Sequence, residues 1–187
     1  TQISEGSEGT VFSDASDSAF VIKKLKDGFF VDLEGKGHRT SEFTLQQYAD
    51  REVQLFNQYY GAGMAEKIVE GGEVYIRMPK VPGKELRELK KGDMPDDGVD
   101  RYVDMLEKLS AAGIWHGDMH SGNVLFDTAD NVFYPIDFSN IREHYLRRAS
   151  GREKANLNII GEGQWNEIVR TISDKKAGVA PGMAGLA

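Results

Sequence analysis

The chain has 187 residues and a mass of 20.8 kDa, a size that suits one domain or two small lobes sharing an interface. Hydrophobic residues make up 40% of the chain, enough for a buried core, so wholesale disorder is excluded. The net charge of −7 argues against a nucleic-acid partner, and the absence of cysteine excludes disulfides, thiol nucleophiles and Cys-ligated metals. No apolar run approaches the roughly 20 residues that a membrane-spanning helix needs.

The first eighty residues favour short strands. Residues 3–12, together with the apolar run at 20–25, predict two hairpin strands with a third beside them. Residues 67–70 and 73–78 predict a second hairpin, because the two glycines between them supply the positive φ of a tight turn. Residues 28–43, which contain three glycines, indicate an irregular insertion.

A helix is expected between the two hairpins. Its stripe repeats at helical spacing and comprises Leu45, Tyr48, Ala49, Glu52, Val53 and Phe56. Thr44, followed three residues later by Gln47, resembles a capping box and marks the start of this helix.

The second half of the chain begins after Pro82 and Gly83, which mark a hinge. A helix is expected over 99–112, with a stripe comprising Val99, Tyr102, Val103, Leu106, Leu109 and Ser110. The remaining expectations are two short strands over 124–126 and 132–136, a charged helical segment over 140–176, and a Gly/Ala-rich tail over 177–187.

The most informative segment is H-G-D-M-H-S-G-N at 116–123. Asp118 and Asn123 lie five residues apart in a loop, and Asp137 follows fourteen residues later, with both short strands between. Phosphoryl transfer needs such parts: one carboxylate receives or orients the attacking hydroxyl, while a carboxylate and an amide oxygen hold magnesium against the phosphates.

This segment, with I-D-F-S at 136–139, resembles the H-R-D-x-x-x-x-N and D-F-G motifs of the protein kinase-like superfamily. The resemblance implies that Asp118 is the catalytic aspartate and that Asn123 and Asp137 are the magnesium ligands. Two motifs at the right spacing, each beside its expected strand, make a chance acidic loop a poor alternative.

The segment departs from the kinase pattern at several positions. Gly117 stands where the motif has arginine, which implies activity without phosphorylation of an activation segment. His120 replaces the lysine that would contact the γ-phosphate, and it is kept as a catalytic candidate. Ser139 replaces the glycine of D-F-G. His116 is expected to hydrogen-bond within the loop rather than to act as a base.

Residues 4–11, S-E-G-S-E-G-T-V, resemble the Gly-rich loop of kinases. The resemblance implies that Gly6, Ser7 and Gly9 close over the phosphates of ATP and that Val11 packs on adenine. Taken alone, the segment fits a plain hairpin equally well.

Residues 20–23, F-V-I-K, resemble the strand V-A-I-K, whose lysine pairs with the α- and β-phosphates. Lys24 is a rival for this role, but strand alternation places Val21 and Lys23 on one face and favours Lys23. Glu52 lies on the apolar stripe of its helix, where a buried carboxylate is costly unless paired. Lys23 is its natural partner; the alternative is a partly exposed Glu52 at the edge of the stripe.

Residues 73–83, E-V-Y-I-R-M-P-K-V-P-G, resemble the strand and hinge that hold adenine. The resemblance implies that Met78 is the gatekeeper, that the Pro79 carbonyl accepts from the adenine amine, and that the Val81 amide donates to the ring. An ordinary strand ending in a turn fits this stretch equally well.

The expected fold is therefore α+β, a minimal bilobal protein kinase-like fold formed as one domain. An antiparallel-sheet N-lobe is expected over 1–81, a truncated helical C-lobe over 82–176 and a flexible tail over 177–187. Truncation is expected because only fifty residues follow Asp137 and no A-P-E motif is present.

L-F-N-Q-Y-Y-G at 55–61 and I-D-F-S-N-I at 136–141 are similar to OspG-type and NleH-type effector kinases, and the whole pattern looks closest to the HopBF family. The resemblance implies an ATP- and magnesium-dependent Ser/Thr protein kinase that a bacterium secretes by a type III system into the host cytoplasm. HopBF membership implies the heat-shock protein 90 chaperone as substrate. An OspG-like protein would instead bind a ubiquitin-loaded conjugating enzyme.

Two further functions compete with this one. H-G-D-x-H-x-G-N also looks like the small-molecule phosphotransferases, although those enzymes build their acceptor pocket from additional C-terminal helices. A pseudokinase binding module is the other rival. It is disfavoured because the full kinase set is present: Lys23, Glu52, Asp118, Asn123 and Asp137.

Overall fold

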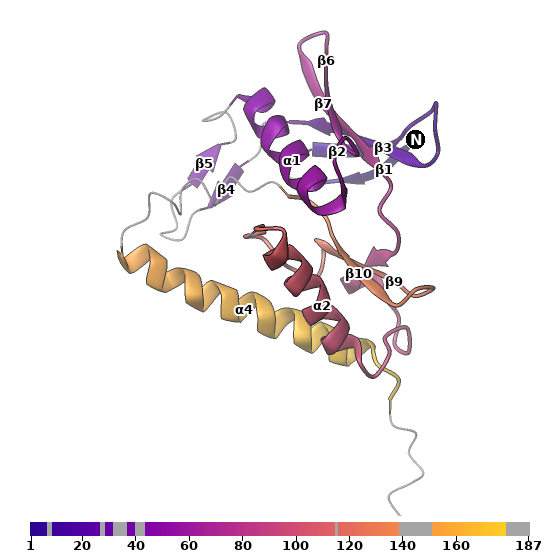
Figure 1. Cartoon of the computed structure of the whole chain (residues 1–187), viewed down its shortest axis with the longest axis vertical. Coiled ribbons are helices and arrows are strands. Elements are labelled where there is room, and N and C mark those ends of the chain that lie inside the picture. Colours follow the sequence, from indigo (N-terminus) through magenta and orange to yellow (C-terminus); the bar gives the residue numbers. More distant parts are fainter. Residues whose placement is uncertain are drawn as a thin grey trace, which may run out of the picture.

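The computed structural model describes residues 1–6, 9–26, 29–31, 37–39, 44–114, 116–138 and 151–178, with the backbone alone described for 29–31, 37–39 and 151–162. An antiparallel sheet and the helix packed on it form the first part of the described chain. Two more helices and a small sheet form the second part (Figure 1).

The larger sheet has five strands in the order β1-β2-β3-β7-β6, and each neighbouring pair is antiparallel. Its strands are β1 (Gln2–Glu5), β2 (Gly9–Ser13), β3 (Phe20–Leu25), β6 (Glu66–Glu70) and β7 (Glu73–Pro79). Both expected hairpins are confirmed, and Gly71 and Gly72 have the positive φ angles that the turn requires, 59° and 83°. The pairing of β3 with β7 joins the hairpins and places β3 at the centre of the sheet.

The irregular insertion expected over 28–43 is wrong in part. Two three-residue strands, β4 (Phe29–Val31) and β5 (Gly37–Arg39), pair there in antiparallel register. Strands this short carry too little alternation of apolar and polar residues to be seen in a sequence. The rest of that insertion, like residues 139–150 and 179–187 of the expected helical segment and tail, lies outside the described residues.

Helix α1 (Leu45–Tyr60) lies across the larger sheet, as Figure 1 shows. The capping box is confirmed: the Gln47 amide donates to the Thr44 hydroxyl at 3.2 Å, and the Thr44 amide donates to the Gln47 side chain at 3.1 Å. The expected stripe faces the sheet, and its members Tyr48, Ala49, Glu52 and Phe56 are all buried.

The second part begins with the two-residue strand β8 (Lys84–Glu85) and a 3-10 turn, η2 (Leu86–Glu88), neither of which was expected. Strand β8 pairs with β9 (Val124–Asp127), which pairs with β10 (Val132–Pro135), and these two strands confirm the prediction. The prediction of a helix after Pro95 is also confirmed by α2 (Gly98–Ala111).

The predicted stripe of α2 needs correction. Its buried positions are Gly98, Tyr102, Met105 and Leu109, whereas Ser110 is exposed. The buried line therefore passes through Met105 rather than Ser110. Helix α4 (Gly151–Lys175) packs against α2.

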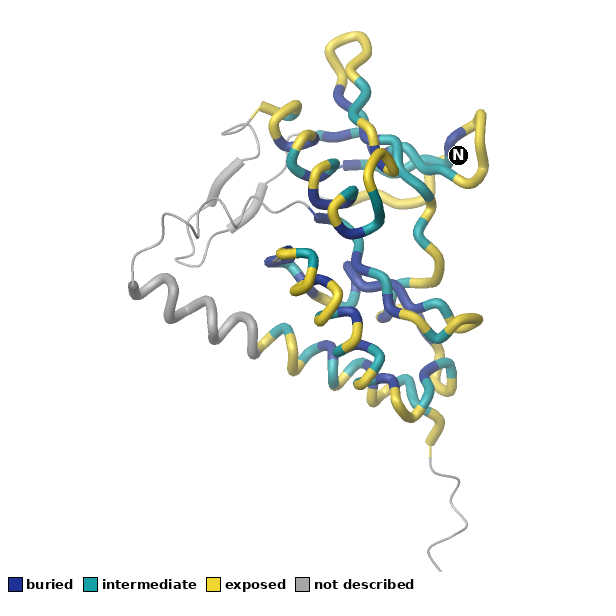
Figure 2. The backbone as a smooth tube through the Cα atoms, viewed as in Figure 1, coloured by how far each residue is buried: buried dark blue, intermediate teal, exposed yellow. Residues whose placement is uncertain are grey.

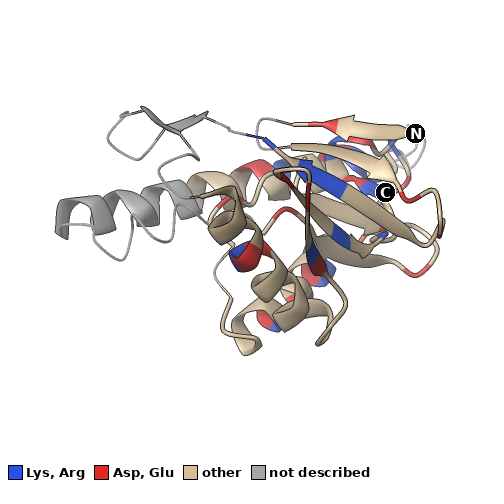
Figure 3. Cartoon of the chain, turned by 90° about the horizontal axis from the view of Figure 1, so that it is seen from above, with Lys and Arg blue, Asp and Glu red and all other residues tan. Residues whose placement is uncertain are grey.

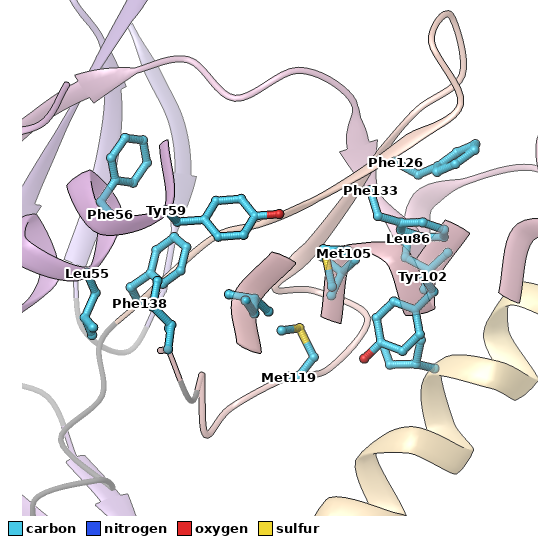
Figure 4. Close-up of a cluster of buried hydrophobic side chains, with 14 of the residues drawn as sticks. Leu55, Phe56, Tyr59, Leu86, Tyr102, Met105, Met119, Phe126, Phe133 and Phe138 are labelled. Atoms are coloured by element: carbon cyan, nitrogen blue, oxygen red, sulfur yellow. The ribbon is translucent and has the colours of Figure 1, made fainter. Parts of the chain in front are cut away.

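The core runs through both parts of the described chain, as the dark segments of Figure 2 show. Large aromatic side chains dominate it, among them Phe56, Phe126, Phe133 and Phe138 (Figure 4). Phe126 and Phe133 face each other across the β9–β10 pair with ring centroids 4.7 Å apart. Burial of each such ring stabilises the fold by roughly 1.5–3 kcal/mol.

Acidic and basic residues are interspersed over the sheet and the helices (Figure 3). None of the described helices has the length and apolar character that crossing a membrane would require.

Candidate active site

Lys23 on β3 is the centre of a cluster of charges in which Lys23 and Glu52 are buried and the Asp137 side chain is 34% exposed. Its Nζ donates to both carboxylate oxygens of Glu52, at 2.8 and 3.0 Å, and to Oδ1 of Asp137 at 2.8 Å. The side chains of Lys23 and Glu52 are only 9% and 3% exposed. The cluster thus joins the sheet, helix α1 and the segment after β10, although its residues are up to 114 positions apart in the chain.

Local geometry explains why Lys23 rather than Lys24 lies inside. Strand alternation turns Lys24 outward, where it pairs with Glu73 at 3.4 Å on the surface. Gly9 on β2 allows the strands to approach closely here, because a Cβ at Gly9 would lie 2.6 Å from the Lys24 carbonyl oxygen and 3.3 Å from Cγ of Lys23.

The charge balance of the cluster keeps Lys23 protonated. Burial by itself would lower the pKa of Lys23, but the carboxylates of Asp137 and Glu52 outweigh burial and raise the pKa above its ordinary value. Glu52 is therefore a buried and paired carboxylate, and the alternative of a partly exposed Glu52 is excluded. Lys23 remains a fixed positive charge at any physiological pH.

His116 connects the loop at 116–123 to the segment that carries Asp137. Its Nε2 donates to the Ile136 carbonyl at 2.7 Å, and its Nδ1 accepts from the Asp118 amide at 3.4 Å. Burial lowers the pKa of His116, so the neutral ring that this bonding pattern requires is favoured. The expectation that His116 hydrogen-bonds within the loop is confirmed.

Asn123 fixes the position of Asp118 from the other end of the loop. Its Nδ2 donates to the Asp118 carbonyl at 3.0 Å and to Oδ2 of the Asp118 carboxylate at 3.4 Å. The amide nitrogen is thereby engaged, so Oδ1 is the atom of Asn123 suited to a cation. The Asp118 carboxylate is 40% exposed, unlike the nearly buried Asn123.

His120 lies beside Asp118, with 3.8 Å between Nε2 and the Asp118 carboxylate and with 47% of its side chain exposed. Its Nδ1 accepts from the Gly122 amide at 3.1 Å. A side chain at Gly122 would be tightly packed, because a Cβ there would lie 3.0 Å from both the His120 ring and the Arg87 guanidinium.

An aromatic cluster supports the segment after Asp137, and sequence reasoning missed it. The Phe138 ring is within 6.2 Å of the rings of Phe56, Tyr59 and Tyr60 on α1, and it also meets the His116 ring at 5.4 Å. Figure 4 shows Phe138 between α1 and the loop. The available signal was the spacing of the α1 aromatics at i, i+3 and i+4, which places them on one face.

Asp137 has a φ of 59°, a backbone conformation that a non-glycine residue rarely adopts. The Lys23 ion pair and the packing of Phe138 hold it there. Strain of this kind persists only where the surroundings enforce it, and it is typical of functional sites.

The remaining candidates lie on strands β2, β3 and β7 or close to these strands in the chain. Val11 faces Lys23 across β2 and β3, and Met78 faces Val21 across β3 and β7. The Pro79 position pairs with Phe20, and the half-buried Val81 packs against the core. The Gly6 amide donates to the Gly9 carbonyl at 2.9 Å, whereas Ser7 lies outside the described residues.

Comparison with known proteins identifies the family. Residues 2–162 match the profile described as protein kinase OspG, kinase domain. The chain belongs to the OspG kinase-domain family. It is 35% identical over 143 residues to protein kinase OspG of Shigella flexneri serotype X (strain 2002017) and of Shigella sonnei (strain Ss046), covering 76% of this chain and 68% of each relative. Its fold is accordingly a minimal α+β protein-kinase fold.

Solved structures of WbdD are also similar. The structure of WbdD with the kinase inhibitor LY294002 is 15% identical with a TM-score of 0.48, covering 91% of this chain and 44% of that one. The bifunctional kinase-methyltransferase WbdD is 21% identical with a TM-score of 0.42, covering 65% of this chain and 28% of that one. The chain spans less than half of either WbdD chain, and the family match alone supports the fold assignment.

Proposed function

We propose that the protein is an ATP- and magnesium-dependent Ser/Thr kinase that phosphorylates a protein of a host cell. The observation that carries this proposal is the buried cluster in which Lys23 contacts both Glu52 and Asp137. A lysine, its orienting carboxylate and a metal-binding carboxylate must lie together for phosphoryl transfer, and a degenerate binding module has no need to retain all three.

Lys23 binds the α- and β-phosphates of ATP in this proposal, and Glu52 orients it. Burial makes that attraction strong, because a cation in a water-poor site is screened less than one at the surface. Around Lys23, the phosphates and adenine are held by the residues of the Gly-rich loop and hinge: Gly6, Ser7, Gly9, Val11, Val21, Met78, Pro79 and Val81.

Asn123 and Asp137 are suited to magnesium. Both offer hard oxygen atoms, and the Asn123 amide nitrogen is already engaged by Asp118. Magnesium bound here would complete its coordination shell with phosphate oxygens and water, because this ion is usually held by one or two protein ligands. Bound magnesium would neutralise the charge that develops on the transferred phosphoryl group.

Asp118 accepts the hydrogen bond of the substrate hydroxyl and orients it toward the γ-phosphate. Its exposed carboxylate is open to an incoming protein, while His116 and Asn123 hold its backbone. His120 lies beside it and contacts the γ-phosphate in place of the usual lysine. We place the boundary between the lobes at Pro82, so that ATP lies between residues 1–81 and 82–176.

The family match also supports a role as a secreted bacterial effector acting in the host cytoplasm. The substrate proposed here is the heat-shock protein 90 chaperone, on the resemblance to the HopBF family. The match to OspG favours a second candidate, in which the kinase engages a ubiquitin-loaded conjugating enzyme.

The test is transfer of labelled phosphate from ATP by the purified protein in host-cell lysate, with and without magnesium, followed by identification of the labelled residue. We expect magnesium-dependent labelling of serine or threonine in one or a few host proteins. Parallel reactions with purified heat-shock protein 90 and with a ubiquitin-loaded conjugating enzyme separate the two candidates. Absence of transfer to any protein, the kinase itself included, would contradict the proposed activity.

A further inference from the structure

The second half of α4 packs against α2 and reaches the catalytic loop, which we define as residues 116–123. Ile168 and Ile172 have no exposed surface, and the Trp165 ring lies 5.8 Å from that of Tyr102 on α2. This part of α4 is therefore a fixed element of the fold, and its polar side chains reach the loop from a well-defined position.

Glu167 on this part of α4 bonds directly to the catalytic loop. The backbone amide of Ser121 donates to Oε2 of Glu167 at 3.2 Å. The Thr171 hydroxyl donates its single proton to the Glu167 carbonyl at 2.8 Å, and its oxygen also lies 3.3 Å from the other carboxylate oxygen, Oε1, which can share that proton. The helix thus holds the carboxylate in the orientation that meets the loop.

A second connection reaches the other side of Ser121. The Arg87 amide donates to the Ser121 carbonyl at 3.2 Å. Lys175, at the end of α4, donates to the carbonyl of Arg87 at 3.0 Å and to the carbonyl of Leu89. Both backbone polar groups of Ser121 are therefore held by segments that α4 contacts.

We propose that Glu167 is a positioning residue that holds the catalytic loop for transfer. This inference rests on the proposed function, since it assigns a task to Glu167 through Asp118 and Asn123. Ser121 lies between these two residues in the chain. Greater mobility of the backbone at Ser121 would therefore displace both the Asp118 carboxylate, which orients the hydroxyl, and the Asn123 amide, which binds the metal. Glu167 lies beyond the residues 2–162 that the family profile matches.

The inference predicts an effect on the rate of transfer more than on nucleotide binding, because Lys23 and Glu52 are anchored elsewhere. Misplacement of reacting groups by about 1 Å costs up to about 100-fold in rate, so partial loosening in Glu167→Ala should lower kcat about tenfold. The KM for ATP should stay within about twofold of the wild-type value. Glu167→Gln should recover most of the rate, because its amide oxygen still accepts from Ser121.

The experiment combines kinetics with amide hydrogen exchange of Ser121 measured by NMR, on wild type, Glu167→Ala and Glu167→Gln. Exchange at Ser121 should accelerate about tenfold in Glu167→Ala and stay near wild type in Glu167→Gln. Asp174→Ala is the matched control, since Asp174 is an exposed carboxylate on the same helix, and it should change neither readout.

The inference is overturned if Glu167→Ala keeps the wild-type kcat, if Glu167→Gln is as impaired as Glu167→Ala, or if Ser121 exchange does not change. Equal melting temperatures of the two variants would separate loop positioning from loss of fold. A wild-type protein without transfer activity would contradict the proposed function alone, because the exchange rates still decide whether Glu167 holds the loop.

Discussion

The two halves of the candidate site differ in how they are held. The side chains of Lys23 and Glu52 are at most 9% exposed, and their opposite charges form a direct ion pair. Around Asp118 and His120 the side chains are 40% and 47% exposed, and backbone hydrogen bonds hold the loop. The buried half is suited to binding the phosphates of a nucleotide tightly, whereas the exposed half is accessible to a large protein substrate.

The two halves also differ in the free-energy cost of burying their charged groups. A buried charge is tolerated only when paired, so the half around Lys23 must be assembled before any ligand arrives. The exposed half carries no such cost, and its order comes from His116, Asn123 and Glu167 acting on the backbone around Asp118. Substitutions in the first half should therefore affect stability as well as nucleotide binding, and those in the second half should affect mainly transfer.

The largest effect is expected from Asp118→Ala. Loss of the group that orients the hydroxyl should lower phosphate transfer by about 10³-fold, within the range for a general base. Stability should change little, since the carboxylate is 40% exposed and Asn123 keeps its bond to the Asp118 carbonyl. Steady-state transfer assays with chemical denaturation as a companion measurement check both points. Asp130→Ala, at an exposed turn position, is the control that should behave as wild type.

Lys23→Met should have the next largest effect, and on stability. It leaves the Glu52 carboxylate buried without its cation, which costs about 3 kcal/mol of unfolding free energy. The double variant Lys23→Met/Glu52→Leu should recover most of this loss, because a buried ion pair is often replaceable by apolar side chains. Urea denaturation measures all three proteins, with Lys24→Met as the surface control.

If the double variant is as unstable as Lys23→Met alone, the loss of the Lys23 charge beside the Glu52 carboxylate is not the source of the lost stability. The division between a buried, stability-determining half and an exposed, rate-determining half would then be wrong.

Gly9→Ala should destabilise the protein by about 2 kcal/mol, as overpacking typically does. The added Cβ would meet the Lys24 carbonyl oxygen at 2.6 Å, a backbone atom that cannot move aside cheaply. Gly163→Ala is the control for a glycine with open space, because nothing lies within 4 Å of the Cβ it adds, and inside helix α4 it should be neutral or slightly stabilising. Thermal denaturation of both variants and the wild type decides the point, and a wild-type midpoint for Gly9→Ala would show that β2 and β3 can move apart without cost.

The smallest expected effect is the decrease in unfolding free energy that His116 causes on acidification. Because burial lowers its pKa in the folded protein, the unfolded chain binds more protons below the ordinary value of 6.5. Unfolding free energy should therefore fall as the pH drops below about 6.5, by at most about 1.4 kcal/mol per pH unit from this group. Denaturation between pH 8 and pH 5.5 should show a shallower slope in His116→Gln, and an identical slope would exclude His116 as the source.

Much of this architecture could be predicted because the decisive signals are local. The capping box at Thr44, the paired glycines between β6 and β7, and the stripe of α1 each depend on residues a few positions apart. The burial of Glu52 followed from its place on that stripe and from the cost of an unpaired carboxylate. Closeness to the HopBF family is untested by the family match and stays a prediction.

What could not be predicted depends on contacts between distant segments. The short strands β4, β5 and β8 have too few residues to show the alternation of apolar and polar residues that marks a strand. Strand β8 forms by pairing with the edge of β9, which is distant in the chain. The buried face of α2 includes Met105 rather than Ser110, which depends on tertiary packing and not on the helical period alone. Glu167 lies thirty residues beyond Asp137, and no motif connects it with Ser121.

The most direct test of the central claim compares binding of magnesium-ATP by Asp118→Asn and Asp137→Asn, measured by calorimetry against the wild type. If the buried half grips the nucleotide and the exposed half receives the substrate, Asp118→Asn should bind within about twofold of wild type, and Asp137→Asn should bind at least about tenfold more weakly, a difference of about 1.4 kcal/mol. Equal loss of binding in both variants, or loss in Asp118→Asn alone, would contradict this division of the site.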